Sequence, residues 1–514
     1  MSANPFTYGN PISDPARFYG RTHEIEQVFS RLRNAEFESS SLVGERRIGK
    51  TSLLNYLAHP DVRRTHGLDP DKHIFVYVDL EMVDRATTPA RLWQRLLRQM
   101  ARHCQSDQVK QILAQVRQAD AIDNFALEDV FDSVDEQDHY VVLLLDEFEN
   151  VTENSNFGPD FFYGLRSLAI HHHLSLITSS RRELIELCHS EAIRSSPFFN
   201  IFANINVGLF SEDEARQFIT RSLEGTGIGF SEADLDTVFR LAGYHPYFLQ
   251  AACYFLFESY SKNLSPQERA KFVAKEFREE AAPHLADYWH TTEDHQRIVL
   301  LLLALLEQGR ASRHALSVGQ LQDYYARADQ TLSHLEKRGL VVSRPDGYTL
   351  LSAALAEWIV REITGNGMSG ASDQEPEDEL SHRQLGKLRQ NLVDHFSDDE
   401  LRTLCFDLGT DYENLPAEGK AGKVRELVAH LERTARLTDL IEACRKRRPN
   451  VAWDDALKAP RAVIIPAGSQ AERLLADILP RISAKYRGLI AGWVSESENP
   501  TAVAGLFQSA PRLG

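Results

Sequence analysis

The stretch that decides the fold is Gly44-Glu45-Arg46-Arg47-Ile48-Gly49-Lys50-Thr51. It follows the apolar run 39–43 and directly precedes the helical pattern of residues 52–57. The spacing is that of a phosphate-binding loop, GxxxxGK followed by Ser or Thr, whose glycines let backbone N–H groups wrap phosphates. The alternative is a glycine turn that matches the pattern by chance.

The polar residues of this loop have expected tasks at a nucleotide. Lys50 is expected to reach the β and γ phosphate oxygens of ATP, and the Thr51 hydroxyl is expected to ligate Mg²⁺. The N-terminus of the following helix adds a positive field. The residues expected to bind the phosphates are Gly44, Arg47, Gly49, Lys50, Thr51 and Ser52.

A second signal is the apolar run 141–145, which ends in Asp146 and Glu147. Burying two carboxylates at the end of such a strand is costly unless they have a role. Asp146 suits coordination of a magnesium ion, and Glu147 suits polarising an attacking water. The alternative is that they are two exposed acids after a strand, with no catalytic role. The run 73–80 leaves room for an inserted strand between the phosphate loop and the acidic strand.

A third candidate follows the strand-like run 174–179, which leads into Ser180, Arg181 and Arg182. An arginine or a hydroxyl at the tip of this neighbouring strand could face the γ-phosphate, and an arginine could stabilise transition-state charge. The alternative is a solvated basic start of a helix. The expected catalytic residues are therefore Glu147, Lys50 and Arg181.

Composition restricts the class of protein. A chain of 514 residues exceeds one hydrophobic core, so two to four domains are expected, and 43% apolar with 25% charged residues is typical of a globular protein. The N-terminus lacks the pattern of a secretory signal, and the longest apolar run, 298–306, is too short to span a membrane. We expect a cytoplasmic protein with no membrane partner. Five scattered cysteines indicate neither a disulfide framework nor a zinc site.

The chain divides into five expected segments. Residues 1–255 alternate strand-like runs with helical patterns, which indicates a parallel α/β sheet with a helical lid. Its strand candidates are 39–43, 73–80, 140–145, 174–179 and 205–209. Residues 256–363 are helical and end in a hairpin at 339–351, the pattern of a winged helix. Segment 364–380 has the composition of a flexible linker, 381–455 of a small all-α bundle, and 456–514 of a tail with one expected helix near 469–490.

With these motifs, the first 360 residues resemble the STAND class of AAA-like signalling ATPases. The segment Phe18-Tyr19-Gly20-Arg21 looks like the GR motif of that class, which implies that Tyr19, Gly20 and Arg21 lie near the adenine and ribose. The segment 243–250 looks like its GxP motif, which implies that Pro246 packs on the base. The alternatives are a helix-capping glycine and an aromatic core cluster.

Residues 385–453 are similar to the seventh type of effector-associated domain, a death-like helical adaptor. That resemblance implies recruitment of an effector protein by like-with-like contact. The bundle also carries acids at 398–400 and a basic run at 445–448, which could meet head to tail between copies; the alternative is two solvated faces. The sequence shows no effector chemistry of its own.

We therefore expect a switch in which ATP binding repositions the winged helix and exposes the bundle to an effector, in prokaryotic conflict or defence signalling. Hydrolysis is expected to be slow and to reset the switch, and ATP binding could promote self-association. A rival is an ATP-dependent winged-helix transcription regulator that reads DNA with residues 329–337. The formal net charge of −17 and the mixed charge of that helix argue against nucleic acid. A second rival is a constitutive ATP-driven remodelling machine.

Overall fold

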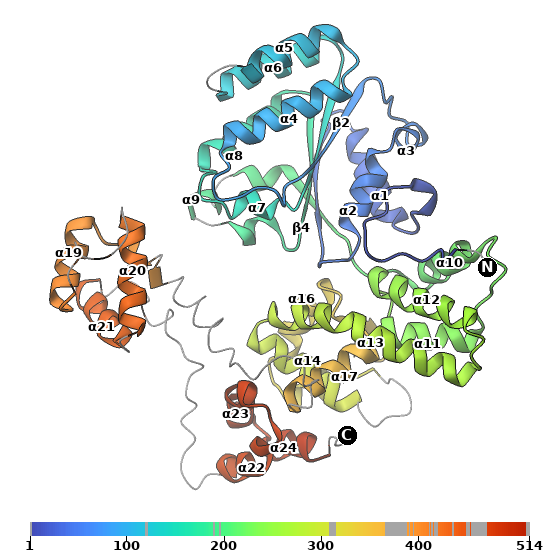
Figure 1. Ribbon diagram of the computed structural model, residues 1–514, viewed down its shortest axis with the longest axis vertical. Helices are drawn as coiled ribbons and strands as arrows, with labels where there is room; N and C mark the ends of the chain where they lie inside the picture. Colours follow the sequence, from blue (N-terminus) through green and yellow to red (C-terminus); the bar gives the residue numbers. More distant parts are fainter. Residues whose placement is uncertain are drawn as a thin grey trace. The chain divides into compact units, whose positions relative to one another are not determined.

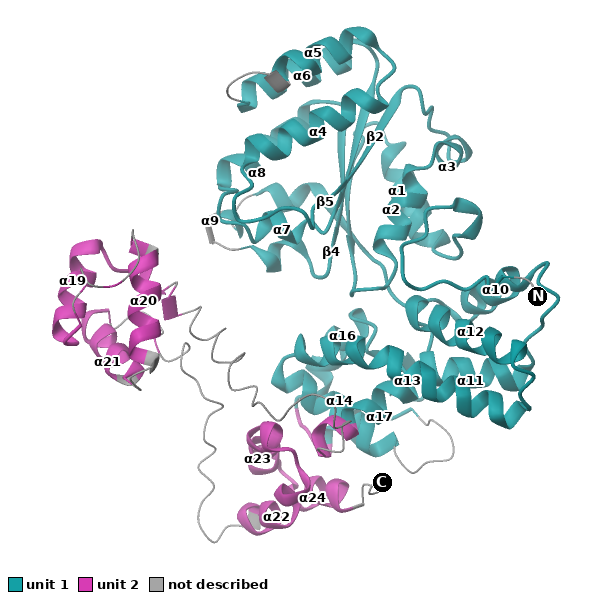
Figure 2. Cartoon of the chain, in the orientation of Figure 1, with its two compact units in different colours: residues 1–322, 327–359 teal, residues 323–326, 360–514 magenta. Residues whose placement is uncertain are grey.

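The computed structural model has two compact units, whose elements are labelled in Figure 1 and which are coloured separately in Figure 2. Unit 1 comprises residues 1–322 and 327–359, and unit 2 comprises residues 323–326 and 360–514. The structure describes residues 3–118, 122–188, 191–194, 197–307, 315–364, 388–389, 391–393, 395–410, 412, 415, 420–433, 436–448, 453 and 470–509. All of the expected linker beyond residue 364 lies outside them.

The core of unit 1 is a parallel sheet of five strands in the order β2-β3-β4-β1-β5 (Figure 1). The strands are β1 Ser39–Val43, β2 His73–Asp79, β3 Tyr140–Asp146, β4 Leu174–Ser180 and β5 Phe202–Asn206. β3 is apolar along its length because both faces of the sheet are covered. Val142 and Leu144 lie in one hydrophobic cluster, and Val141, Leu143 and Leu145 lie in the other.

Helices cover each face of this sheet. The cluster around Val142 includes residues of α1 Thr22–Leu32, α2 Lys50–Ala58 and α3 Pro60–Thr65. The opposite cluster includes residues of α4 Pro89–His103, α5 Asp107–Gln118, α6 Asn124–Glu136, α7 Glu149–Thr152, α8 Pro159–His171 and α9 Glu191–Arg194. Short 3-10 helices lie at Pro15–Arg17, Leu184–Leu187 and Pro197–Ile201. This is the expected α/β architecture of a P-loop NTPase.

Two details of the sheet differ from expectation. The strand between the phosphate-loop strand and the acidic strand is β4, whereas the inserted run 73–79 forms the edge strand β2. The last strand begins three residues earlier than expected and ends at Asn206, because the chain leaves the sheet once the Val207 amide has bonded to the Val43 carbonyl, 2.7 Å away.

Helices and a hairpin follow the sheet in unit 1. The first group is α10 Glu212–Leu223, α11 Glu232–Ala242, α12 Pro246–Ser261 and α13 Pro266–His290. The second group is α14 Asp294–Glu307, α15 Val318–Gln322, α16 Ala328–Lys337, β6 Val341–Arg344, β7 Gly347–Leu350 and the start of α17 Ala353–Thr364, whose residues from 360 onward belong to unit 2. β6 and β7 pair antiparallel, and Leu316 adds a bridge to Tyr348. Three helices followed by this hairpin form the expected winged helix.

Unit 2 contains the expected all-α bundle. Its helices are α19 Asp398–Asp407, α20 Lys420–Arg433 and α21 Leu437–Arg447, and they share a core that includes Leu404, Val428, Leu440 and Trp453. Ser397 caps α19 in a capping box with Glu400, as the sequence pattern predicts.

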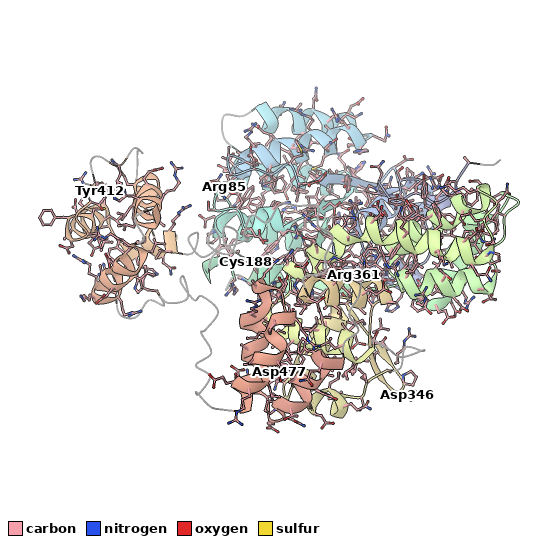
Figure 3. All side chains as sticks on the ribbon, turned by 60° about the horizontal axis from the view of Figure 1, so that its bottom comes forward. Arg85, Cys188, Asp346, Arg361, Tyr412 and Asp477 are labelled. Carbon is pink, nitrogen blue, oxygen red and sulfur yellow. The ribbon has the colours of Figure 1, made fainter. Side chains whose placement is uncertain are left out.

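The charged residues of this bundle also make contacts within it. Glu400 forms an ion pair with Arg448 in the same bundle, and Asp407 does so with Arg447. Asp398 accepts a hydrogen bond of 2.9 Å from the hydroxyl of Tyr412, which is labelled in Figure 3. A head-to-tail contact between copies through these groups would first have to break contacts within one bundle.

The C-terminal segment holds more structure than one helix. It forms α22 Gln470–Ile478, 3-10 turns at Leu479–Arg481 and Ala484–Tyr486, α23 Arg487–Glu496 and α24 Pro500–Ser509. The expected long helix is interrupted because Pro480 cannot donate a backbone hydrogen bond. The Ser483 amide donates to the Ile363 carbonyl over 2.8 Å, and the Tyr486 hydroxyl donates to Glu362 over 2.7 Å. The segment therefore packs on the end of α17.

The five cysteines are buried free thiols. Across the described part of the chain, no helix combines the length and apolar character that crossing a lipid bilayer requires.

Candidate functional site

The phosphate loop runs from the end of β1 to the start of α2, and its two glycines are required for different reasons. A Cβ atom at Gly44 would lie 2.4 Å from the backbone oxygen of Val207, so any side chain there would displace the neighbouring strand exit. Gly49 caps α2 with φ of 102°, a left-handed conformation that favours glycine. The loop therefore follows a path that places successive amides at the start of a helix.

Lys50 is buried beneath this loop, with 5% of its surface exposed. Its ammonium donates to the backbone oxygens of Gly44 and Glu45 over 2.8 and 3.1 Å. Burial lowers the pKa of Lys50, whereas the nearby carboxylates of Glu147, Glu149 and Asp146 favour its charged form. The ammonium is thus surrounded by oxygens before any phosphate is considered.

Asp146 is held by the strands on either side of it. Its Oδ2 accepts a hydrogen bond of 3.0 Å from the Tyr77 hydroxyl of β2, and its Oδ1 accepts one from the Ser179 hydroxyl of β4. Ser179 also accepts the Glu147 amide at 3.2 Å. Burial and the Asp146 carboxylate raise the pKa of Tyr77, so its hydroxyl remains a donor. Each carboxylate oxygen retains lone pairs for a further ligand.

Sequence analysis missed Tyr77 and Ser179. Tyr77 lies two residues before the end of β2, and Ser179 lies one residue before the end of β4. Polar residues at these positions indicate contact with Asp146 only if β2 and β4 are known to flank β3. The sequence does not give that strand order.

Glu147 leaves the sheet in a left-handed conformation, with φ of 54°. Such a conformation is strained for a residue with a side chain and is common at functional sites. Phe148 follows in the hydrophobic core and bonds through its amide to the Ser179 carbonyl over 2.9 Å. The turn places the half-buried Glu147 side chain at the cavity described below.

Glu149 is a third acid that the sequence analysis missed. It is 5% exposed, and its Oε1 accepts the Arg181 amide at 3.3 Å and lies 3.6 Å from Arg181 Nε. Its Oε2 has no hydrogen-bond partner within the described structure. Burial and the neighbouring Glu147 raise the pKa of Glu149 to about 7, against the opposing effect of Lys50 and Arg181. The contact with Glu149 draws Arg181 toward the site and away from a purely solvated position.

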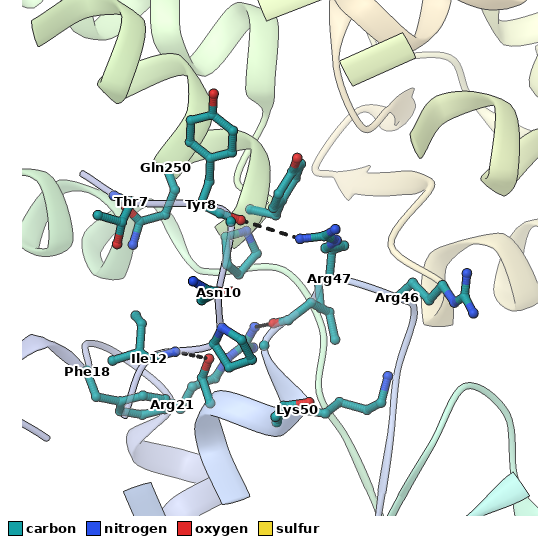
Figure 4. A pocket seen from close by; sticks show the side chains of 18 of the residues that line it. Thr7, Tyr8, Asn10, Ile12, Phe18, Arg21, Arg46, Arg47, Lys50 and Gln250 are labelled. Atoms are coloured by element: carbon teal, nitrogen blue, oxygen red, sulfur yellow. Dashed lines mark hydrogen bonds between the residues drawn. The ribbon is translucent and has the colours of Figure 1, made fainter. Parts of the chain in front are cut away.

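A cavity of about 620 Å³ joins these groups to the N-terminal segment (Figure 4). The expected residues that line it are Arg47, Gly49, Lys50, Thr51, Ser52, Tyr19, Arg21, Pro246, Glu147 and Arg181. Three expected residues lie outside the lining. Gly44 supplies the carbonyl that holds Lys50, Asp146 is buried behind Glu147, and Gly20 packs against Glu214 and Phe210. The structure therefore brings the expected set together from distant parts of the chain.

The N-terminal segment 7–12 is a part of this cavity that sequence analysis did not foresee. The Ile12 amide donates to the Ser52 hydroxyl over 3.0 Å, and the Asn55 amide group donates to the Ile12 carbonyl over 3.3 Å. Ser52 thus uses its hydroxyl to hold this segment against α2.

Two arginines tie the phosphate loop to its surroundings. Arg21 is 3% exposed, donates to the Ile48 carbonyl over 3.0 Å and pairs with Glu24 at 3.1 Å. Arg47 reaches in the opposite direction, with its guanidinium 4.9 Å from the ring centre of Tyr247 on α12. Arg21 therefore positions the loop, and Arg47 links it to the segment that resembles a GxP motif.

A glycine loop at a helix N-terminus, a buried lysine and an acidic strand end define a P-loop NTPase, a class of protein that binds nucleoside triphosphates at this site. The family model described as novel STAND NTPase 2 matches residues 33–302, which is more than half of the chain. The chain belongs to this family of STAND NTPases. A second model, effector-associated domain 7, matches residues 388–449, so the bundle of unit 2 has the expected type.

Several solved structures are similar to this chain at low identity. The Walker-type ATPase PABY2304 of Pyrococcus abyssi is 14% identical, covers 68% of this chain and 98% of its own, and has a TM-score of 0.44. The ORC2 protein of Aeropyrum pernix, solved as ADPNP-ADP complexes, is 16% identical over 69% of this chain and 96% of its own, with a TM-score of 0.44. The Holliday junction branch migration motor RuvB of Thermotoga maritima is 12% identical over 66% and 96%, with a TM-score of 0.32. No curated protein sequence matches the chain.

Replacing Lys50 by alanine tests the phosphate site. We expect ATP affinity, measured by calorimetry, to fall at least about tenfold, because charge-assisted hydrogen bonds contribute roughly 1.5–3 kcal/mol each. The matched control is Lys72→Ala, which removes an exposed lysine paired with Asp138 before the start of β2. Equal ATP affinity in the two variants would contradict the assignment.

The buried Glu149 gives the folding equilibrium a predictable pH dependence. Because the folded state holds the proton of Glu149 more tightly than the unfolded state, the free energy of unfolding should fall as pH rises from about 4.5 to about 7. The shift corresponds to roughly 3 kcal/mol at most. Glu149→Gln should lack this contribution and gain stability over wild type at pH 8, as measured by chemical denaturation.

The control for that measurement is Glu153→Gln, which changes an exposed acid at the end of the same short helix. Its stability should follow wild type between pH 4.5 and pH 8. A Glu149→Gln profile parallel to wild type would show that Glu149 does not titrate in this range.

Proposed function

We propose that this protein is an ATP-operated molecular switch that recruits an effector protein through the bundle at 381–455, in prokaryotic conflict or defence signalling. ATP and Mg²⁺ bind in the domain 1–255, slow hydrolysis resets the switch, and the winged helix at 256–363 transmits the change. The segment 364–380 acts as the tether. The observation that carries the proposal is an ion pair between the phosphate loop and the winged helix, formed by Glu45 and Arg338.

This ion pair lies in a network that joins the two domains. Arg338, the residue after α16, also donates to the hydroxyls of Thr292 and Thr291 over 2.9 and 3.1 Å. The side chains of Arg338 and Glu45 are 15% and 11% exposed, so their pairing is largely shielded from water. Removing one partner of a buried pair leaves an uncompensated charge, which is strongly unfavourable. Movement of the loop should therefore require movement of α16.

A second contact holds the next residue of the loop. The Tyr288 hydroxyl of α13 donates to the Arg46 carbonyl over 2.8 Å and lies 2.9 Å from His245 Nε2. Burial lowers the pKa of His245 to about 3, so this imidazole stays neutral. The phosphate loop is thus connected through Tyr288 to the segment 243–250, which contains the N-cap His245 and the start of α12.

The residues around the cavity suit the chemistry of ATP hydrolysis. We assign Lys50 to the phosphates, Thr51 and Asp146 to Mg²⁺, and Glu147 to the attacking water. Carboxylate and hydroxyl oxygens are the ligands that Mg²⁺ prefers, and the lone pairs that Asp146 retains fit this role. Arg181, drawn toward the site by Glu149, would stabilise charge on the transferred phosphoryl group.

The walls of the cavity suit the remainder of the nucleotide. Tyr19 and Pro246 line it together, and they supply apolar surface for the base and ribose. Arg21 contributes by holding the Ile48 carbonyl of the phosphate loop, and Gly20 contributes by allowing close approach of Glu214 and Phe210. These assignments are consistent with membership of the STAND family.

The surface of α16 does not favour a transcription regulator. Its exposed residues include Asp329, His334, Glu336 and Lys337, a mixed face, whereas DNA readers present basic ones. Arg338 faces Glu45 and not solvent. We therefore infer that α16 transmits movement of the phosphate loop and does not read DNA.

Recruitment is assigned to the bundle that matches effector-associated domain 7. Phe406 on α19 is 82% exposed, and we assign it to the contact with the effector because its ring offers apolar surface to a partner. Contact through Phe406 leaves the internal pairs of Glu400 and Asp407 intact.

Glu147→Gln tests the switch most directly. Glutamine keeps the size of glutamate but cannot accept a proton, and losing a general base typically slows a reaction by about 10² to 10⁴. We expect ATP to stay bound and the protein to self-associate more readily than wild type, as measured by hydrolysis rates and size exclusion. Glu153→Gln is the control. A normal hydrolysis rate would show that Glu147 is not catalytic. Slow hydrolysis without self-association would contradict the proposed switch.

Arg338→Ala tests the link between the loop and the winged helix. Losing the pair with Glu45 should uncouple movement of the phosphate loop from movement of α16. The ATP concentration for half-maximal self-association should rise about fivefold or more, the lower end of typical allosteric coupling. The control is Lys337→Ala, an exposed neighbour on the same helix. Identical titrations for the two variants would contradict the proposed transmission.

A further inference from the structure

Helix α4 carries an unusual row of arginines. Arg91, Arg95, Arg98 and Arg102 are all exposed and follow the spacing i, i+4, i+7, i+11, which places them on one face of the helix. The helix contains no carboxylate, although the chain as a whole has a formal net charge of −17. We name these four residues the arginine face.

The arginine face borders a groove of about 470 Å³ between α4 and the end of β2. Met82 also lines the groove and is 72% exposed. Within the described structure, no ion pair involves Arg91, Arg95 or Arg98. The carboxylates of Asp79 and Asp84 also line the groove, and Asp84 accepts hydrogen bonds from Thr87 and from the Ala86 amide while its charge interacts with that of Arg91. Four arginines thus share the groove with two carboxylates, so the groove keeps an excess of positive charge.

Helix α6 has the opposite character. It contains five carboxylates and no basic residue, and those of Glu128, Asp129, Asp132 and Glu136 are exposed. Phe125 in its first turn is 78% exposed. We name these five residues the acidic face. Three of its carboxylates and Phe125 repeat the spacing of the arginine face, at 125, 129, 132 and 136.

The two faces do not neutralise each other within one chain. The inner sides of α4 and α6 meet through Trp93 and Phe131, whose ring centres lie 6.4 Å apart in the core. Among the described residues no ion pair joins the two helices; Asp135, on the inner side of α6, bonds to His172 at 2.9 Å, and Asp132 lies 3.7 Å from the same ring. Most of the charged groups on both faces form no ion pair within the described structure, so they are available to a partner of opposite charge.

We propose that a second copy of this chain binds here, with the arginine face of one copy against the acidic face of the next. The inference rests on the proposed ATP-dependent self-association and names its surface. Complementary rows of charge steer encounter and set register, and the exposed Phe125 and Met82 add apolar contact at the groove. Single surface ion pairs contribute only about 0–1 kcal/mol, so a row of them makes a reversible contact.

The groove is connected to the nucleotide cavity through consecutive residues. Glu81 lines the nucleotide cavity, whereas Met82 and Val83 line the groove. The same segment continues β2, whose Tyr77 holds Asp146. A change at the acidic strand end can therefore reach the arginine face along one short stretch of chain, which couples assembly to the nucleotide.

Charge reversal on each face gives a direct test in the Glu147→Gln full-length protein with ATP. Arg95→Glu with Arg98→Glu, and separately Glu128→Arg with Asp129→Arg, should each raise the dissociation constant for self-association about tenfold or more, because attraction becomes repulsion. A 1:1 mixture of the two variants should restore assembly, since each reversed face then meets its opposite. ATP affinity should stay at the level of the parent protein.

The outcomes separate this inference from the proposed function. If the parent assembles and both variants assemble equally well, or if the mixture does not restore assembly, the two faces are not the interface. If the arginine variant instead loses salt-sensitive binding to a duplex oligonucleotide while assembly is unchanged, the face binds nucleic acid and the inference fails. If the Glu147→Gln parent stays monomeric with ATP, the switch and the inference fail together.

Discussion

The arrangement of this protein depends on keeping one ammonium buried at the carboxyl ends of a parallel sheet. Lys50 lies beneath the phosphate loop, where loss of hydration disfavours its charge. Two loop carbonyls and the nearby carboxylates of Asp146, Glu147 and Glu149 compensate for that loss. These groups meet because the strands are parallel and only β4 lies between β1 and β3. The phosphate loop after β1 and the acidic end of β3 therefore lie close together at the carboxyl ends of the strands.

The same loop is where the domains of unit 1 are joined. Arg338 holds the side chain of Glu45, Tyr288 holds the carbonyl of Arg46, and Arg21 holds the carbonyl of Ile48. Three separate elements thus contact consecutive parts of one phosphate-binding segment. A loop restrained in this way cannot adapt to a nucleotide independently of its neighbours, and this restraint is the physical basis of the switch that we propose.

Charge is distributed unevenly over an acidic chain. In the bundle of unit 2, Glu400 and Arg448 satisfy each other, which leaves the exposed Phe406 as the candidate contact. On the sheet domain, by contrast, most charged groups of the arginine face of α4 and of the acidic face of α6 form no ion pair within the described structure. This contrast supports our proposals that the bundle recruits an effector and that the sheet domain self-associates.

The sequence by itself determined the features that depend on local spacing. The phosphate loop, the acidic end of β3 and the capping box at Ser397 each follow from residues a few positions apart, since amide geometry and helix periodicity act over that range. The tertiary structure decided which strand lies beside β3, and with it the bonds from Tyr77 and Ser179 to Asp146. It also decided the pair between Glu45 and Arg338, which are 293 positions apart. Such contacts arise from strand order and domain packing, which no periodicity along the chain encodes.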